Sequence, residues 1–136
     1  MKTVAKVLVY NPDGNILVLR RSTTHPRFAY HLDFPGGEVE ADEPAEQTIS
    51  RELREETGLE IDVQNVRPVY EQKVNEKLLY LIYETKLPEL PQVTVSWEHD
   101  QYYWLSAAAL LSQNLPPAVD AYYAAVIEYL RVQIVR

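Results

Sequence analysis

The segment RELREETGL, from Arg51 to Leu59, decides how this sequence is interpreted. It combines good helix formers with Gly58, a residue type that commonly follows the last turn of a helix. Yet Glu52, Glu55 and Glu56 crowd its last turns, where the helix dipole disfavours negative charge. Glu52 and Glu56 also form a like-charge pair four residues apart, which costs about a few tenths of a kcal/mol. The sequence thus puts carboxylates where an isolated helix tolerates them least.

The limits of this helix follow from two residue types. Pro44 suits the first helical position and keeps the residue before it out of helical angles, so Glu43 falls at or next to the N-cap. The helix is then predicted to run to about Thr57, with Gly58 as the cap beyond it.

The direction of each side chain follows from the helical repeat of about 100° per residue. Ile49 and Leu53 mark an apolar face directed at the protein interior. Glu52 and Glu56 fall inside or beside that face, and Glu55 lies at its edge. The glutamates are therefore predicted to point at the protein body and not at bulk water.

Carboxylates gathered in a partly dry site cannot all stay ionised without compensation. Either their pKa values rise or a cation lies among them. The chain has no cysteine and no histidine near this segment, so the ligands would be oxygen atoms, which suit Mg²⁺ or Mn²⁺. The alternative is a solvated acidic helix face with Arg51 and Arg54 as partners, and the inward orientation argues against it.

The composition narrows the class of protein. The 136 residues, 46% of them hydrophobic, predict one domain over residues 1–136. The absence of cysteine excludes disulfides and thiol nucleophiles. No apolar run approaches the roughly 20 residues that span a bilayer, and the N-terminus is unlike a signal peptide, so a cytoplasmic protein without membrane contact is expected. The net charge of −7 disfavours binding to duplex nucleic acid.

Alternating and β-branched segments predict strands on both sides of the central helix. Two β-hairpins are expected, one turning at residues 11–14 and the other at Asn75–Glu76. A short strand near Tyr30–Leu32, a strand at residues 101–106 and a short helix at residues 107–113 are also expected. With a further helix at the end of the chain, this order predicts a mixed α/β or α+β sandwich.

The C-terminal segment, residues 116–136, begins with prolines and continues without a breaker, which predicts a helix. This helix is apolar nearly all round. We expect it either to pack deep against the sheet or to form part of a homodimer interface.

Gly36 and Gly37, in FPGG just upstream of the central helix, are predicted to form a tight turn where the backbone can approach a bound substrate. Read from Gly37, the segment GEVEADEPAEQTISRELREETGL resembles the Nudix box, G-x5-E-x7-R-E-U-x-E-E-x-G-U, in which U is aliphatic. Every specified position is met, with Leu53 and Leu59 at the aliphatic ones. Outside the box, the resemblance rests on strand order and on the segment WEHDQYYWLS.

The resemblance implies a Nudix fold, an α/β/α sandwich around a mixed sheet, and hydrolysis of a nucleoside diphosphate linked to another group. It implies that Glu52 and Glu56 are the main Mg²⁺ ligands and that Glu55 is a further ligand or the base that activates water. The backbone carbonyl of Gly37 would join the metal shell. Such metal ions neutralise a diphosphate and lower the pKa of a bound water, whose proton a carboxylate then accepts.

The resemblance also implies a structural ion pair between Glu43 and Arg51 that braces the preceding loop against the helix. The helical projection agrees, because it places Arg51 on the outward side, away from the metal. Gly58 completes the structural residues of the box.

Residues outside the box supply further candidates. One of Arg20 and Arg21 is expected to bind a terminal phosphate of the substrate. Phe28 and Tyr30, which precede the box, are expected to contact the base or the sugar.

The segment SWEHD offers an acidic residue from a loop outside the box, a position that often completes a Nudix metal site or acts as base. Glu98 is the candidate for this role. His99, beside it, is expected to form a hydrogen bond or to contact substrate rather than to bind the metal.

Together these features predict a Mg²⁺-dependent Nudix hydrolase that cleaves a phosphoanhydride bond, with a nucleoside triphosphate or modified nucleotide as the expected small-molecule substrate. Nucleotide sugars, ADP-ribose and dinucleoside polyphosphates stay open as alternatives. A Nudix-fold module that binds a nucleotide without cleaving it is a rival, although binding alone requires no water-activating carboxylate. An isomerase of the isopentenyl diphosphate type shares the fold but needs a catalytic cysteine, which this chain lacks.

Overall fold

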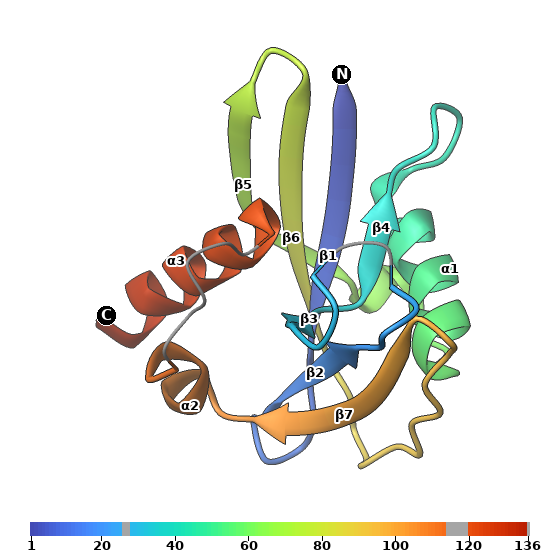
Figure 1. Cartoon of the computed structure of the whole chain (residues 1–136), viewed down its shortest axis with the longest axis vertical. Helices are drawn as coiled ribbons and strands as arrows, with labels where there is room; N and C mark the ends of the chain where they lie inside the picture. The colour runs from blue at the N-terminus through green and yellow to red at the C-terminus, as the bar shows by residue number, and fades with distance from the viewer. Residues whose placement is uncertain (26–27, 114–119, 136) are drawn as a thin grey trace.

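The computed structural model describes residues 1–25, 28–113 and 120–135. The elements, labelled in Figure 1, are β1 (Lys2–Tyr10), β2 (Ile16–Arg21), β3 (Leu32–Asp33), β4 (Gly36–Glu38), α1 (Ala45–Thr57), the 3₁₀ helix η1 (Val63–Asn65), β5 (Arg67–Asn75), β6 (Leu78–Lys86), β7 (His99–Leu105), α2 (Ala107–Leu111) and α3 (Ala121–Val135). No helix in the described ranges is long and apolar enough to cross a membrane.

The strands form one seven-stranded mixed sheet. Its centre is the parallel pair of β1 and β6, which stays in register from Lys2 opposite Leu78 to Tyr10 opposite Lys86. Antiparallel pairing adds β5 beside β6 and β4 beside β1. β2 touches β1 at its end and carries β3 and β7. The predicted mixed α and β fold is therefore confirmed.

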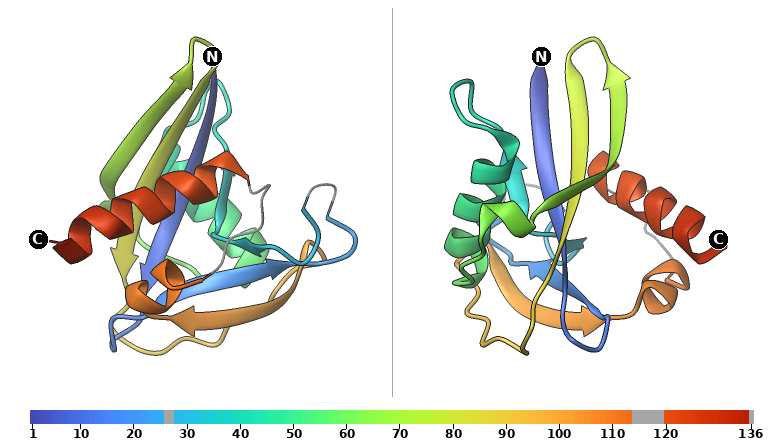
Figure 2. Two further views of the ribbon diagram at one scale, coloured as in Figure 1. Left: turned by 60° about the vertical axis from the view of Figure 1, so that its left-hand side comes forward. Right: turned by 180° about the vertical axis from the view of Figure 1, so that it is seen from behind.

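Helices cover both faces of this sheet, as Figures 1 and 2 show, with α1 on one side and α3 on the other. Successive residues of a strand point to opposite faces, so Val7 packs in the apolar cluster that contains Leu53 of α1. Its neighbour Leu8 packs in the cluster that contains Val126 of α3. The sandwich thus has two cores, one on each face of the sheet.

The central helix lies close to its predicted limits. Pro44 is the N-cap, with an extended ψ of 148°, so the helix begins one residue later than predicted. It ends at Gly58, which takes the left-handed conformation (φ 75°) and donates its N–H to the carbonyl of Arg54 at 2.9 Å. Ile49 and Leu53 are fully buried, which confirms the predicted inward face.

The first predicted hairpin is confirmed at its turn, where β1 and β2 pair antiparallel at Tyr10 opposite Ile16, but the pairing does not extend along the strands. The turn is present, since the N–H of Gly14 donates to the carbonyl of Asn11 at 2.9 Å. However, β1 pairs along one edge with β6 and along the other with β4, so β2 turns away and pairs with β7. The second predicted hairpin is confirmed, because β5 and β6 pair up to Asn75 opposite Leu78.

The predicted tight turn at Gly36 and Gly37 is wrong, because both residues lie in β4. Gly36 has a φ of 138°, and a Cβ placed there would lie 2.1 Å from the carbonyl oxygen of Ala5 in β1. Glycine is thus required by the close approach of two strands. The short strand predicted near Tyr30–Leu32 lies slightly later, at Leu32–Asp33.

The prolines at positions 116–117, which were predicted to begin the last helix, lie outside the described residues. Within the described part, α3 buries Tyr122, Tyr123, Val126 and Leu130 against the sheet. This packing supports the first of the two roles predicted for the helix. The homodimer interface stays a prediction.

Candidate active site

The predicted glutamates meet at one end of a pocket of about 370 Å³. Glu52 and Glu56 of α1, Gly36 and Gly37 of β4, and Glu98 of the loop before β7 all line this end. Elements that are far apart in the sequence therefore bring three carboxylates to one place, as the sequence predicted for the first two and proposed for the third.

The three glutamates of α1 differ in exposure. Glu56 is 5% exposed, the Glu52 side chain is 21% exposed, and the Glu55 side chain is 54% exposed. The inward orientation predicted for Glu52 and Glu56 is confirmed, and Glu55 lies at the edge of the face as expected. Glu55 is not among the described residues that line the pocket.

The glycines of β4 fit closely around these carboxylates. The N–H of Gly36 donates to Oε1 of Glu56 at 2.9 Å, inside the protein. A Cβ at Gly37 would lie 2.9 Å from both Cδ and Oε1 of Glu52. Glycine at this position therefore leaves the space that the Glu52 carboxylate occupies.

The environment opposes full ionisation of this cluster. Burial raises the pKa of Glu56 well above its usual value, and the charges of Asp33 and Glu52 add to this effect, while the Lys6 ammonium opposes it. Burial also raises the pKa of Glu52, and Glu55 beside it raises it further. A cation bound among these carboxylates would remove the mutual repulsion, which is the compensation that the sequence predicted.

Arg51 is closer to the glutamates than predicted. Its guanidinium pairs with Glu43 at 3.1 Å, so the predicted ion pair is present, and Thr48 donates to the same carboxylate at 2.5 Å. The prediction that Arg51 lies away from the site is wrong, because its Nη1 also lies 3.1 Å from Glu52 and 3.6 Å from Glu55. A long side chain on the outer helix face can bend back over the edge and reach both neighbours.

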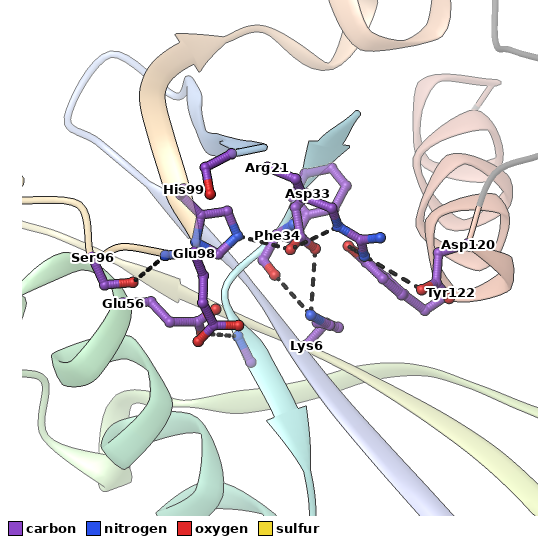
Figure 3. Close-up of polar contacts among 12 residues, drawn as sticks. Lys6, Arg21, Asp33, Phe34, Glu56, Ser96, Glu98, His99, Asp120 and Tyr122 are labelled. Carbon is purple, nitrogen blue, oxygen red and sulfur yellow. Dashed lines mark hydrogen bonds and ion pairs between the residues drawn. The ribbon is translucent and has the colours of Figure 1, made fainter. Parts of the chain in front are cut away.

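A second polar cluster, centred on Asp33, lies beside the glutamates (Figure 3). A β-bulge between β2 and β7 places Arg21 opposite His99. His99 Nε2 lies 2.9 Å from the Asp33 carboxylate, Arg21 Nε 3.3 Å and Lys6 Nζ 3.4 Å. Although burial alone would raise it, Lys6, His99 and Arg21 hold the pKa of Asp33 well below its usual range.

One oxygen of Asp33, one oxygen of Glu56 and one nitrogen of His99 lie within 4.8 Å of one another, a spacing that could hold a metal ion. Asp33, however, already faces the cations Lys6 and Arg21, which would repel a divalent ion. Glu52 and Glu56 also lie near cations, Arg51 and Lys6, but the pKa of each is still raised, whereas that of Asp33 is lowered. The glutamates are therefore the better metal candidates.

The pocket lining also has an aromatic and apolar part, its aromatic end, in which Lys2 lies opposite Leu78. Val4 of β1, Leu78 and Tyr80 of β6, and Tyr122 at the start of α3 line it. Asp120, just before α3, also lines this end and accepts a hydrogen bond from Arg21 at 3.3 Å. Such a mixture of aromatic surface and a few polar groups is typical of small-molecule sites.

The two candidate arginines at the end of β2 have different surroundings. Arg21 is buried and lines the pocket. Arg20 forms a two-pronged pair with Asp100, at 2.7 and 2.9 Å, on the surface. Of the two, only Arg21 lines the pocket in the described part of the chain, so Arg21 is the better candidate for a substrate contact.

Phe28 and Tyr30, the predicted base or sugar contacts, lie in the loop between β2 and β3 with positive φ values of 54° and 67°. Phe28 stacks on His31 with ring centroids 5.3 Å apart. Tyr30 is 56% exposed, near Arg20. Neither is among the described pocket-lining residues, so their contact with substrate stays a prediction.

Sequence reasoning missed several residues of this pocket. Lys6 and Asp33 were not considered, although an isolated lysine within the apolar segment TVAKVLVY is an unusual feature that could have marked Lys6. Tyr80 of β6 also lines the pocket, although a tyrosine in a strand is more often explained by packing within the sheet. Asp120 and Tyr122 carry no motif, and only the packing of α3 places them here.

Comparison with known proteins gives this geometry a family. The model of the NUDIX domain matches residues 2–128 of the chain. The chain belongs to the Nudix family. The glutamates and glycines described above thus come from a Nudix hydrolase, and enzymes of this family generally use divalent metal ions.

Two curated Nudix relatives come from Escherichia coli. A CTP pyrophosphohydrolase is 32% identical over 106 residues, which cover 78% of this chain and 77% of the relative. An 8-oxo-dGTP diphosphatase is 28% identical over 122 residues, with coverage of 85% and 88%. Among solved structures, the MutT protein of Methanosarcina mazei matches with a TM-score of 0.75 and 25% identity over 98% of this chain and 95% of that one. The Nudix fold is therefore shared over almost the whole chain.

Proposed function

We propose that this Nudix hydrolase, acting as a single domain, cleaves a phosphoanhydride bond of a nucleoside triphosphate. The observation that carries the proposal is the pocket itself, which joins a cluster of buried carboxylates to an aromatic surface. A polyphosphate with its metal ion fits the first end and a nucleoside the second. The activities named for the two bacterial relatives, on CTP and on 8-oxo-dGTP, support the same substrate class.

The residues present fit a bound Mg²⁺ or Mn²⁺. The site offers the carboxylates of Glu52 and Glu56 and the carbonyl of Gly37, and hard divalent ions prefer oxygen ligands of this kind. Burial raises the pKa of both glutamates, so a cation bound between them would favour their ionised forms. When bound, such an ion neutralises phosphate charge and makes a bound water more acidic.

Among the remaining carboxylates, Glu98 is best placed to accept the proton of the attacking water. It lines the pocket beside Glu56 of α1, as Figure 3 shows, and comes from a separate loop. That loop is fixed, because the carbonyl of Glu98 accepts from the N–H of Ser22 at 2.9 Å. Glu55, in contrast, is half exposed and pairs with Arg51 at 3.6 Å, so we assign it a supporting role.

The pocket volume favours a single nucleotide over a dinucleotide. About 370 Å³ is near the lower end of the range for small-molecule sites, roughly 300–1,000 Å³. Nucleotide sugars, ADP-ribose and dinucleoside polyphosphates would extend a second large group beyond this space. They serve as comparison substrates in the test.

The test is a substrate panel with Mg²⁺ and with EDTA, in which products are separated by anion-exchange chromatography. CTP, dCTP and 8-oxo-dGTP represent nucleoside triphosphates, and UDP-glucose, ADP-ribose and diadenosine tetraphosphate represent the alternatives. We expect metal-dependent release of a nucleoside monophosphate from at least one triphosphate, with a higher kcat/KM than for any alternative. Turnover confined to the alternatives, or absent throughout, would refute the substrate class.

Variants separate the roles of the carboxylates. Glu52→Gln and Glu56→Gln are expected to weaken Mn²⁺ binding, measured by electron paramagnetic resonance, by roughly tenfold or more. Glu98→Gln is expected to lower kcat by roughly 10²–10⁴-fold, as loss of a general base does, with a smaller change in Mn²⁺ affinity. Glu55→Gln is the matched control on the same helix. A Glu98 variant with parental kcat would remove this residue from the mechanism.

A further inference from the structure

Lys6 is an unusual residue for the middle of a central strand. It lies in β1 between apolar neighbours, is 7% exposed, and lines the pocket. Burial of an ammonium group is unfavourable unless partners replace its water. The contacts of Lys6 therefore show how far the protein meets that requirement by itself.

The protein meets it only in part. Within the described part of the chain, Nζ of Lys6 donates to the carbonyl of Phe34 at 3.1 Å and to Oδ1 of Asp33 at 3.4 Å. It also lies 4.3 Å from the centroid of the Tyr122 ring. An ammonium has three N–H donors, so the two oxygen acceptors, one of them distant, leave one donor that meets only the Tyr122 ring among the contacts described.

Asp33 is also not reserved for Lys6. Its carboxylate accepts from the N–H of Phe34 at 2.9 Å and lies 2.9 Å from His99 and 3.3 Å from Arg21. These partners hold Asp33 in place without Lys6. Lys6 is thus one of several cationic partners of Asp33, and at 3.4 Å it is placed so that a further anion in the pocket could share its charge.

The position of Lys6 indicates which anion. Lys6 pairs in register with Gly36, whose N–H holds the metal-ligand candidate Glu56. Its ammonium lies over the ring of Tyr122, at the aromatic end of the pocket. Figure 3 shows Lys6 between Glu56 and Tyr122, so it lies at the junction of the two ends.

A bound nucleotide has one group at that junction. Its terminal phosphates belong with the glutamates and their metal ion, and its base belongs with Tyr80 and Tyr122. The phosphate attached to the sugar lies between these two parts of the molecule. We infer that Lys6 is a substrate-binding residue whose ammonium donates a hydrogen bond to a non-bridging oxygen of the α-phosphate, an inference that rests on the proposed nucleotide substrate.

The test compares affinity for a nucleoside monophosphate with affinity for the uncharged nucleoside. CMP and cytidine are the probes, or the corresponding pair for the best triphosphate of the panel, and binding is followed by NMR titration. Loss of a hydrogen bond between charged groups typically weakens binding roughly 10- to 100-fold. We expect Lys6→Met to weaken CMP binding by this factor and to change cytidine binding by less than about threefold, because only CMP carries the phosphate.

Lys2→Met is the matched control. Lys2 lies on the same strand and lines the same pocket, but its side chain is 54% exposed and pairs with Glu38 at 3.8 Å. Lys2→Met also removes one positive charge from the pocket, but it leaves the proposed contact of Lys6 intact. It should therefore shift the ratio of CMP to cytidine affinity much less than Lys6→Met does. Equal shifts in the two variants would overturn the inference.

Two further measurements keep the outcome decisive. Lys6→Gln retains a donor for Phe34 and Asp33 but lacks the charge, and it replaces Lys6→Met if thermal unfolding shows that the latter does not fold. Mn²⁺ affinity should persist in the Lys6 variant, since Lys6 is not a ligand. If the parent protein hydrolyses triphosphates but the ratio of CMP to cytidine affinity is the same in the Lys6 variant as in the parent, only the role of Lys6 is refuted. If the parent protein hydrolyses no triphosphate, the proposed function is refuted.

Discussion

At the scale of single residues, the glutamates of α1 were accessible to prediction because the helical repeat fixes which side chains share a face. The inward orientation of Glu52 and Glu56 could be predicted from the positions of Ile49 and Leu53, which are fully buried. Lys6 and Asp33 could not be found in this way, because their contact joins strands β1 and β3. Pairing between distant strands depends on the whole sheet, which a local pattern does not specify.

Glu56 provides a residue-scale prediction about pH. Because burial raises the folded-state pKa of Glu56 above its usual value of 4.5, the folded chain binds this proton more tightly than the unfolded chain does. The contribution of Glu56 to the free energy of unfolding is therefore fully present below that value and is lost as the pH rises through the folded-state pKa.

The change that tests this is Glu56→Gln without divalent metal. At pH 8 in EDTA, the free energy of unfolding of the variant should equal that of the parent or exceed it by up to roughly 1–2 kcal/mol. Between pH 5 and pH 8, the free energy of unfolding should fall less in the variant than in the parent. Urea unfolding at each pH measures both quantities, and Glu55→Gln, on the exposed edge of α1, is the control. A clear loss of metal-free stability in Glu56→Gln would mean that the carboxylate stabilises the apo fold.

At the scale of elements, helices were predicted more accurately than strand partners. α1 ended at Gly58 as expected, since a left-handed cap is a local property of the chain. The pairing of β2 with β7 and the placement of Gly36 in β4 were missed, since both depend on contacts with distant segments. The sequence indicated that Gly36 and Gly37 allow a close approach of the backbone, but it did not indicate that the approach is to β1 and to Glu52.

The two glycines of β4 give an element-scale prediction. A Cβ at Gly36 would lie 2.1 Å from the backbone oxygen of Ala5, and the φ of 138° is strained for any other residue. Gly36→Ala should therefore lower the free energy of unfolding by several kcal/mol, with roughly 1–3 kcal/mol from overpacking and roughly 1–3 kcal/mol from backbone strain. A Cβ at Gly37 would meet only the flexible end of Glu52. Gly37→Ala should therefore fold but bind Mn²⁺ roughly 10-fold more weakly or worse.

Thermal unfolding and Mn²⁺ titration of the two variants separate these effects. The expected pattern is a low melting temperature for Gly36→Ala and a near-parental one, with weak metal binding, for Gly37→Ala. The reverse pattern would show that β4 is held mainly by the glutamates and not by its contact with β1.

At the scale of the whole molecule, the two-faced sandwich leaves α3 with little to offer a second copy. Its large apolar side chains Tyr122, Val126 and Leu130 are buried in the chain's own core. Among the side chains that the structure describes, its exposed side carries Ala124, Val132 and the ion pair of Glu128 with Arg131 at 3.1 Å. We therefore expect sedimentation velocity to show a monomer at micromolar concentration. A stable dimer that is disrupted by charge reversal at Arg131 would instead support the homodimer interface predicted for this helix.

The parallel pairing of β1 with β6 also sets an order in time. β1 can pair with β6 only when residues 78–86 have been made, so this pairing waits for the synthesis of the chain between the two strands. The β5–β6 hairpin, in contrast, closes over a short loop and can form as soon as it emerges. Until β1 has paired with β6 as well as with β4, Lys6 lacks its place in the central sheet, so we expect the candidate pocket to be completed late in folding.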